Sequence, residues 1–211
     1  MVETKNCEII NIDKGFDNAV QLAKKLFLEG RIFIYPTDTI YGIGANPFNQ
    51  EAVDKINKIK GRDLGKRYIL MINSIENLVK YVEIRSEKHL DFLLSIWPNP
   101  VSVVLPLNSN TKKLLGVQTA SFRIPNERFC LKLLAELQMP LISTSVNYSG
   151  QEPLIEPSVI KDEFSSLTDA IFYTDKKLYI EASTLIDLND SKPVLLREGK
   201  FKFEDILIKF K

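Results

Sequence analysis

Apolar residues recur at two different spacings along this chain, and the alternation between them restricts the fold more than any other feature. Stretches with a period near 3.6, typical of amphipathic helices, alternate with short apolar runs or a period of two, which are typical of strands. The pattern predicts an α/β (α+β) fold with one twisted, mixed β-sheet flanked by helices. No repeat or Gly/Ser/Pro-rich linker divides the sequence, so residues 1–211 are expected to form a single domain.

Local signals place the individual elements. Asp17 is a candidate cap for the first helix, and Gly30 lies where a helix C-terminus favours glycine. Pro36 ends the strand that follows. Strands are expected at 32–35, 68–72, 101–107, 121–125, 141–145, 170–173, 183–188 and 193–197, and further helices at 51–60, 75–82, 86–96, 127–138, 158–164 and 203–210.

Composition excludes several classes of protein. The 28 basic and 27 acidic residues leave a net charge of +1, which argues against a protein that coats nucleic acid or binds an anionic membrane surface. Two cysteines and one histidine are too few for a disulfide framework or an ordinary four-ligand zinc site, so no metal ligands are predicted. The sequence has neither the apolar core of a signal peptide nor a bilayer-length apolar run, and a cytoplasmic protein without membrane contact is expected.

Familiar catalytic motifs are incomplete or missing from the sequence. The segment from Gly61 to Lys66 has three residues between its glycines where a phosphate loop has four, and Arg67 replaces the hydroxyl residue that would hold magnesium. Gly42-Ile-Gly44 lacks the third glycine of a dinucleotide fingerprint, and no G-x-S-x-G segment occurs. His89 falls on the expected helix 86–96, where a surface or packing role is the better interpretation.

Polar segments nevertheless interrupt the strand pattern at several points. Residues 35–42 gather two threonines and two tyrosines on one turn, which suits either a small-substrate pocket or a simple strand-ending turn. Lys60-Gly-Arg62, with Lys66 and Arg67 close behind, follows the helix 51–60. These cations either complement the helix dipole or form a polyphosphate clamp.

Two further strands are expected to carry polar residues on a common face. Period two groups Ser121 with Arg123, and Ser143 with Ser145 and Asn147. Arg123 would project near the core, where its charge requires either a carboxylate ligand or an internal salt bridge. Two late strands, 183–187 and 195–199, also end in polar groups.

Together these segments resemble the YrdC/TsaC family. The resemblance rests on YPTDTIYGIGANP, KGR, WPNPVSVVLP, FRIP, PLISTSVNYSG, STLIDL and LLREG, which occur in this order between about residues 12 and 202. It implies a YrdC-like fold with a concave, basic cavity, in the short, single-domain form. It also implies the activity of an L-threonylcarbamoyladenylate synthase, a nucleotidyltransferase. Such an enzyme condenses L-threonine, bicarbonate or CO2 and ATP to threonylcarbamoyl-AMP and pyrophosphate, for modification of adenosine 37 in tRNA.

The resemblance implies roles for individual residues as well. The residues expected at ATP are Lys60, Arg62, Lys66, Thr119, Ser145, Asn147, Pro153 and Arg197, with Lys60 and Arg62 as catalytic residues. The residues expected at threonine are Thr39, Tyr41, Met71, Arg123, Ser143 and Ser183. Arg123 would pair with the threonine carboxylate, and Tyr41 would line the one-carbon site. Mg²⁺ would accompany ATP, held largely by phosphates and water. The product would pass to the tRNA threonylcarbamoyl transferase machinery, and weak tRNA binding is compatible with this role.

The chain departs from the family pattern in one region. Asp63 stands where a proline usually follows KGR, Arg67-Tyr68 replaces a common Pro-Leu, and Met71 aligns with a histidine often found near threonine. These departures motivate an alternative, a divergent relative with an altered acceptor that handles carbamoyl-adenylate. A second alternative is a non-catalytic RNA-binding module that uses the basic residues between Lys55 and Arg67.

Overall fold

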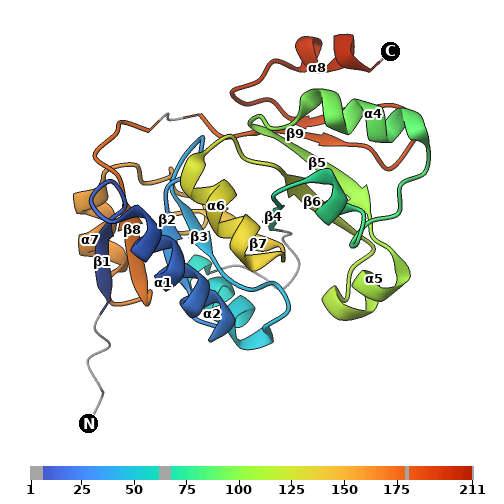
Figure 1. The fold of residues 1–211 in the computed structure, drawn as a ribbon. Coiled ribbons are helices and arrows are strands. Elements are labelled where there is room, and N and C mark those ends of the chain that lie inside the picture. Colours follow the sequence, from blue (N-terminus) through green and yellow to red (C-terminus); the bar gives the residue numbers. More distant parts are fainter. Residues whose placement is uncertain (1–6, 62–67, 179–180, 211) are drawn as a thin grey trace.

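A computed structural model describes residues 7–61, 68–178 and 181–210 of the chain. Its strands form one ten-stranded mixed sheet in the order β1-β8-β2-β3-β7-β4-β6-β5-β9-β10 (Figure 1). The strands are β1 (Glu8–Asn11), β2 (Phe33–Tyr35), β3 (Gly42–Gly44), β4 (Ile69–Met71), β5 (Val101–Pro106), β6 (Thr119–Arg123), β7 (Leu141–Ser145), β8 (Ala170–Tyr173), β9 (Thr184–Asp187) and β10 (Val194–Arg197). The helices are α1 (Phe16–Leu28), α2 (Gln50–Lys60), α3 (Ile75–Leu78), α4 (Glu87–Ile96), α5 (Ser109–Leu115), α6 (Arg128–Leu137), α7 (Pro157–Phe164) and α8 (Phe203–Lys209).

The mixed sheet with flanking helices confirms the predicted fold class, and each predicted strand and helix is present. Three short elements were not predicted, namely β1, β3 and α5. β3 reads Gly-Ile-Gly, which carries no strand signal of its own and pairs because β2 and β7 lie on either side of it. The cap of α1 is Gly15 rather than Asp17, which lies in the first helical turn. Gly30 adopts the expected positive φ, 68°.

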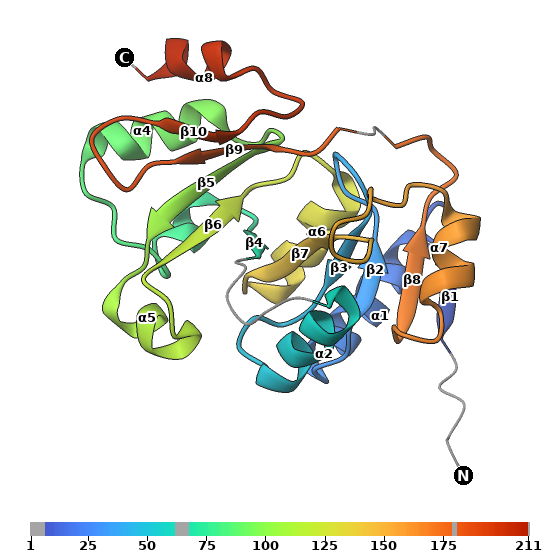
Figure 2. The same ribbon diagram turned by 180° about the vertical axis from the view of Figure 1, so that it is seen from behind.

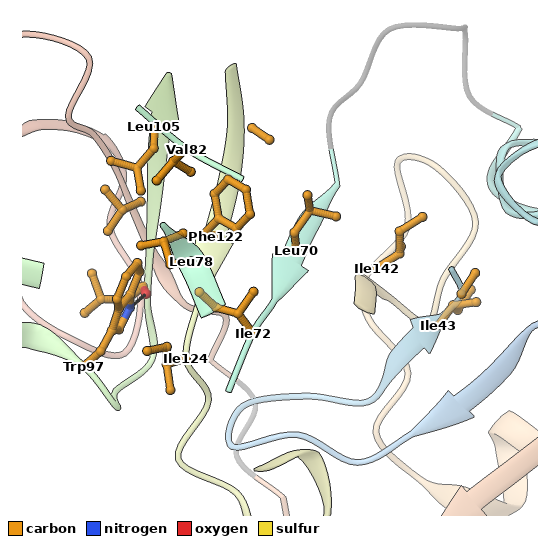
Figure 3. Packing of buried hydrophobic residues seen from close by; sticks show 14 of the residues in the cluster. Ile43, Leu70, Ile72, Leu78, Val82, Trp97, Leu105, Phe122, Ile124 and Ile142 are labelled. Carbon is orange, nitrogen blue, oxygen red and sulfur yellow. Dashed lines mark hydrogen bonds between the residues drawn. The ribbon is translucent and has the colours of Figure 1, made fainter. Parts of the chain in front are cut away.

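Helices cover the two faces of the sheet unequally. α1 and α6 lie side by side over one face, and α2 and α7 cover the other (Figures 1 and 2). The α2 side holds the larger apolar cluster, in which Ile43, Ile142, Leu70 and Phe122 extend across β3, β7, β4 and β6 (Figure 3). The α1/α6 side has a smaller core that includes side chains of β2 and the end of β7.

Polar side chains lie on the same face of the sheet as the α1/α6 core. Directly paired residues of neighbouring strands share a face. Ile69 pairs with both Ser121 of β6 and Ser143 of β7, and Gly42 of β3 pairs with Ser145. The strand register therefore gathers the serines of β6 and β7 beside the helix-covered core, and Ser143 and Ser145 share a face as the period-two pattern predicted.

The α4–α8 contact includes the chain's single histidine and gives a pH-dependent prediction. His89 is buried on α4 beside Phe210, and burial lowers its pKa from 6.5 because the charged form loses hydration. The unfolded chain then binds a proton more readily than the folded chain, so the free energy of unfolding should decrease as the pH falls below about 6.5. Thermal unfolding between pH 7.5 and 5 should show this decrease in the wild type and a smaller one in His89→Asn. Identical pH profiles of thermal unfolding in the wild type and in His89→Asn would contradict this prediction.

Candidate active site

A cavity of about 210 Å³ opens on the polar part of the sheet. Its wall comes from seven separate stretches of chain: Thr37, Thr39, Ile40, Tyr41, Gly42, Tyr68, Ile69, Ser121, Arg123, Ser143, Thr144, Ser145, Pro153, Ala182, Ser183, Leu185 and Arg197. Eight of the predicted site residues are in this wall, namely Thr39, Tyr41, Arg123, Ser143, Ser145, Pro153, Ser183 and Arg197. Segments more than 150 residues apart in sequence thus converge on one hollow.

Hydrogen bonds fix the turn after β2. The Thr37 hydroxyl donates to the Ile40 carbonyl at 2.7 Å and accepts from the Thr39 amide at 3.1 Å. The two threonine hydroxyls lie 3.0 Å apart, and Thr39 Oγ1 also accepts from the Arg123 guanidinium. Because Thr37 donates its proton to Ile40, Thr39 is the donor in the bond between the hydroxyls. The turn is therefore held in one shape by its own side chains.

Arg123 is the buried cation of the cavity wall, with only 2% of its surface exposed. Its Nη2 atom lies 3.1 Å from Asp38 Oδ1, so the internal salt bridge left open by the sequence is present. Nη1 and Nη2 donate to Thr39 Oγ1 at 3.3 and 3.4 Å. Arg123 Nε makes no hydrogen bond with any described residue. The side chain thus keeps a buried donor that a bound anion would satisfy.

Lys60 ties the end of α2 to the loop after β7. Gly61 ends the helix with φ 57°, and the Lys60 side chain, 1% exposed, turns back toward the sheet. Its Nζ donates to the Ser145 carbonyl at 2.6 Å, to Ser145 Oγ at 3.5 Å and to Asn147 Oδ1. Ser145 Oγ in turn donates to Asn147 Oδ1 at 2.6 Å. Lys60 and Asn147 lie behind the cavity wall and contact it through Ser145.

The far side of the cavity carries a second cation. Arg197 Nη2 donates to the Ser183 carbonyl at 2.8 Å, and the Ser183 hydroxyl lies 2.9 Å from that of buried Ser102. Partial burial and, secondarily, the nearby charge of Arg123 lower the pKa of Arg197. An arginine nevertheless stays protonated at neutral pH. Two guanidiniums in the wall of one cavity, where the charge of one acts on the other, favour the binding of an anion.

Tyr41 belongs to the wall of the same cavity. Its side chain is buried in the larger apolar cluster, and its hydroxyl accepts a 3.2 Å hydrogen bond from the amide of Thr174, which lines a different cavity. Burial raises the pKa of Tyr41, so the phenol keeps its proton at neutral pH.

Some predicted site residues are placed elsewhere. Thr119 borders a neighbouring cavity of about 460 Å³, and Tyr68 lies in the walls of both cavities. Met71 is 1% exposed and packs in the α1/α6 core, although it pairs with Arg123 in register. The expected contact between Met71 and threonine is therefore not supported by this position. Arg62 and Lys66 lie outside the described residues.

Two other residues at the site were missed by the sequence analysis. Asp38 pairs with Arg123, and Ser102 bonds to Ser183. The sequence pattern could have indicated Asp38, because it is the only acidic residue of residues 35–42, a turn already noted as polar. Ser102 had only the weak signal of one hydroxyl inside an apolar strand.

The described residues contain neither a metal-binding cluster nor a membrane-spanning helix. Residues 7–61, 68–178 and 181–210 contain no cluster of three or more His, Cys, Asp or Glu side chains arranged to hold a metal ion. Within the same ranges, no helix combines the length and apolar character needed to cross a membrane.

Comparison with known proteins adds three findings. The sequence model of the Sua5/YciO/YrdC family, described as "Telomere recombination", matches residues 25–199. The threonylcarbamoyl-AMP synthase of Pyrococcus abyssi is 32% identical over 203 residues, which cover 94% of this chain and 59% of the relative. That of Pseudoalteromonas translucida is 34% identical over 171 residues, 78% of this chain and 90% of the relative.

A solved structure agrees with the sequence matches. The crystal structure of P. abyssi Sua5 complexed with L-threonine superposes with a TM-score of 0.87 at 29% identity, covering 95% of this chain and 60% of that one. The chain therefore spans about three fifths of the Pyrococcus proteins that it matches.

Proposed function

This chain belongs to the Sua5/YciO/YrdC family, and we propose that it is a threonylcarbamoyl-AMP synthase, a nucleotidyltransferase. The substrates would be L-threonine, bicarbonate or CO2, and ATP, and the products threonylcarbamoyl-AMP and pyrophosphate. The observation that carries the proposal is the cavity whose wall contains both Arg123 and Arg197 together with serine and threonine hydroxyls. Such a hollow suits an amino acid beside a phosphate chain.

In this proposal Arg123 binds the threonine carboxylate. Its Nε–H is buried and without a hydrogen-bond partner among the described residues, and a carboxylate oxygen would accept that bond. The hydroxyls of Thr39, Ser143 and Ser183 line the same wall and would hold the amino and hydroxyl groups of the substrate. Met71 is not included, because its side chain packs in the core.

ATP would lie next to the amino acid. Ser145, Pro153 and Arg197 line the cavity, and Lys60 and Asn147 stand behind Ser145, so the phosphates would lie on this side. Toward the neighbouring cavity lie Thr119 and Tyr68, which could flank the nucleoside. Arg62 and Lys66 are proposed as further phosphate contacts on the strength of the KGR block alone.

The proposed chemistry needs no nucleophile from the protein. The threonine nitrogen forms a bond to the carbon of CO2 and loses a proton, which gives a carbamate. A carbamate oxygen then bonds to the α-phosphorus while the bond from that phosphorus to the bridging oxygen breaks, and pyrophosphate leaves with the electron pair. The protein aligns two anions and balances the charge of the leaving group. Tyr41, a wall residue of the cavity, would line the site of the one-carbon unit.

Mg²⁺ is part of the proposal as a partner of ATP. Because the described residues offer no cluster of acidic ligands, the ion would be held mainly by phosphate oxygens and water. We also propose that the product serves tRNA modification in the cytoplasm and passes to the transferase that acts on tRNA.

The decisive assay measures pyrophosphate release from ATP while threonine and bicarbonate are omitted in turn, with the product identified by mass spectrometry. The proposal expects release only when all three substrates are present. ATP binding without threonine-dependent release would instead favour the divergent transferase. Salt-sensitive tRNA binding with no dependence on ATP would favour the RNA-binding module. Against that module, Lys60 of its basic segment is buried and bonded to Ser145 and Asn147.

Gly42 offers a steric test of the proposed cavity. A Cβ at this position would lie 2.7 Å from Ser143 Oγ, so Gly42→Ala must displace a proposed threonine ligand. We expect kcat/KM for threonine to fall by about 10-fold to 100-fold. The control is Gly15→Ala, where a Cβ meets nothing within 4 Å and which should leave this value unchanged. An active, folded Gly42→Ala with wild-type kcat/KM would argue against the cavity as the threonine site.

A further inference from the structure

Asp38 lies behind the cavity wall, and its carboxylate holds two neighbours. Its Oδ1 forms an ion pair with Arg123 Nη2 at 3.1 Å but accepts no hydrogen bond from a described residue, and its Oδ2 accepts a 3.1 Å hydrogen bond from the amide of Asn126. Both charged side chains are at least 94% buried. Asn126 follows β6 three residues after Arg123, so Asp38 is anchored to the same stretch of chain that carries the arginine.

Asp38 does not touch the space proposed for threonine. Among the described residues it lines a different cavity of about 600 Å³ on the other side of the turn after β2, whereas Arg123 lines the site cavity. Any effect of Asp38 on a ligand in the site cavity must therefore pass through another residue. Of the two groups that its carboxylate contacts, the Arg123 guanidinium belongs to a residue of the site cavity, whereas Asn126 does not line that cavity.

The contacts of the guanidinium determine which donor remains for a ligand. Nη1 and Nη2 are directed to Thr39 Oγ1, and Nη2 also faces Asp38. Nε has no hydrogen-bond partner among the described residues, and Nη1 has a second N–H besides the one directed to Thr39. Since a guanidinium is planar, fixing its two Nη atoms also fixes the direction of Nε–H.

We propose that Asp38 is a positioning residue: by pairing with Nη2 it holds the Arg123 guanidinium so that Nε–H stays available to the carboxylate of an amino-acid substrate. This inference rests on the proposed function. Asp38 also balances the buried charge while the cavity is empty, when Arg123 would otherwise be an unpaired cation near the core.

The first test is Asp38→Asn, which keeps the size of the side chain and removes its charge. With the guanidinium free to turn, we expect the KM for threonine to rise by about 10-fold to 100-fold. The KM for ATP should stay within about twofold, because Asp38 contacts no proposed nucleotide ligand. A merely structural defect would alter both values together.

The matched control is Asp169→Asn. Asp169 is also buried, lies 3.1 Å from an arginine, Arg31, and accepts a 3.0 Å bond from the Ile32 amide, but it lines neither cavity. The Asp169→Asn variant should lose about as much thermal stability as Asp38→Asn does. It should leave the KM for threonine unchanged. A rise in the KM for threonine in Asp169→Asn equal to that in Asp38→Asn would overturn the inference.

A double-mutant cycle identifies the route of the effect. In an Arg123→Gln background there is no guanidinium to orient, so adding Asp38→Asn should lower kcat/KM for threonine no further. Independent, multiplicative losses would overturn the inference. This comparison remains informative if Asp38→Asn alone does not fold, because the double variant contains no unpaired buried charge. Failure of the wild type to release pyrophosphate with threonine would count against the proposed function rather than against the coupling of Asp38 to Arg123, which calorimetric titration with threonine then tests.

Discussion

Replacing Lys60 by methionine is expected to lower kcat/KM for ATP by about 10²–10³-fold, the usual loss when one well-placed donor near developing charge is removed. Methionine fills much of the volume of the aliphatic stem but has no ammonium group. The Ser145 carbonyl and the Asn147 side chain then lose their shared donor, and the loop after β7 is no longer tied to α2. The site should lose local positive charge, and Ser145 should no longer be held in its position.

Steady-state pyrophosphate release at varied ATP measures this effect. Lys58→Met is the matched control, because Lys58 is an exposed lysine in the last turn of the same helix. It should leave kcat/KM within about twofold. Unfolding midpoints must accompany the kinetics, since leaving buried acceptors unpaired costs about 1–3 kcal/mol. Wild-type kcat/KM in a folded Lys60→Met would contradict the proposed role.

Replacing Arg123 by lysine is expected to raise the KM for threonine by about 10²-fold. Lysine keeps the positive charge beside Asp38, so the fold should persist, but it is a compact point charge without the planar fork that can bind a carboxylate. The substitution also removes Nε, the buried donor left for a ligand. Because the phosphates are assigned to the Lys60 and Arg197 side of the site, the KM for ATP should change far less.

Arg31→Lys controls for the change of cation at a buried carboxylate. Arg31 lies 3.1 Å from Asp169 Oδ1, the same separation as in the Arg123–Asp38 pair, and it lines neither cavity. Its replacement should leave the KM for threonine unchanged. If Arg123→Lys and the wild type have the same KM for threonine, the proposed contact between Arg123 and the threonine carboxylate is wrong.

The sequence predicted those features of the fold that depend on local periodicity. The apolar faces of α1 and α6 and the serine pattern of β7 can be seen in short windows. β3 could not be predicted from a short window. Its Gly-Ile-Gly segment forms a strand because β2 and β7 pair with it on either side. The seven-residue helix α5 is similarly short, and most of its residues are polar.

The same holds for the site: residues that follow from a local pattern could be predicted, and those that depend on long-range contacts could not. The face shared by Ser143 and Ser145 follows from the period of a strand, and the blocks of the family resemblance supplied Ser183 and Arg197. The role of Met71 stays a prediction of the family resemblance: Ile69, on the same face of β4, lines the cavity, whereas Met71 packs in the α1/α6 core. Asp38 became important only through its distance to Arg123, 85 residues away in the chain, which no local pattern encodes.

A crystal structure of the protein with L-threonine and a non-hydrolysable ATP analogue tests the central claim most directly. The account predicts the threonine carboxylate within hydrogen-bond distance of Arg123 Nε, and the analogue's phosphates on the Ser145 and Arg197 side of the same cavity. Threonine bound away from Arg123, or the two ligands in cavities that do not meet, would contradict it.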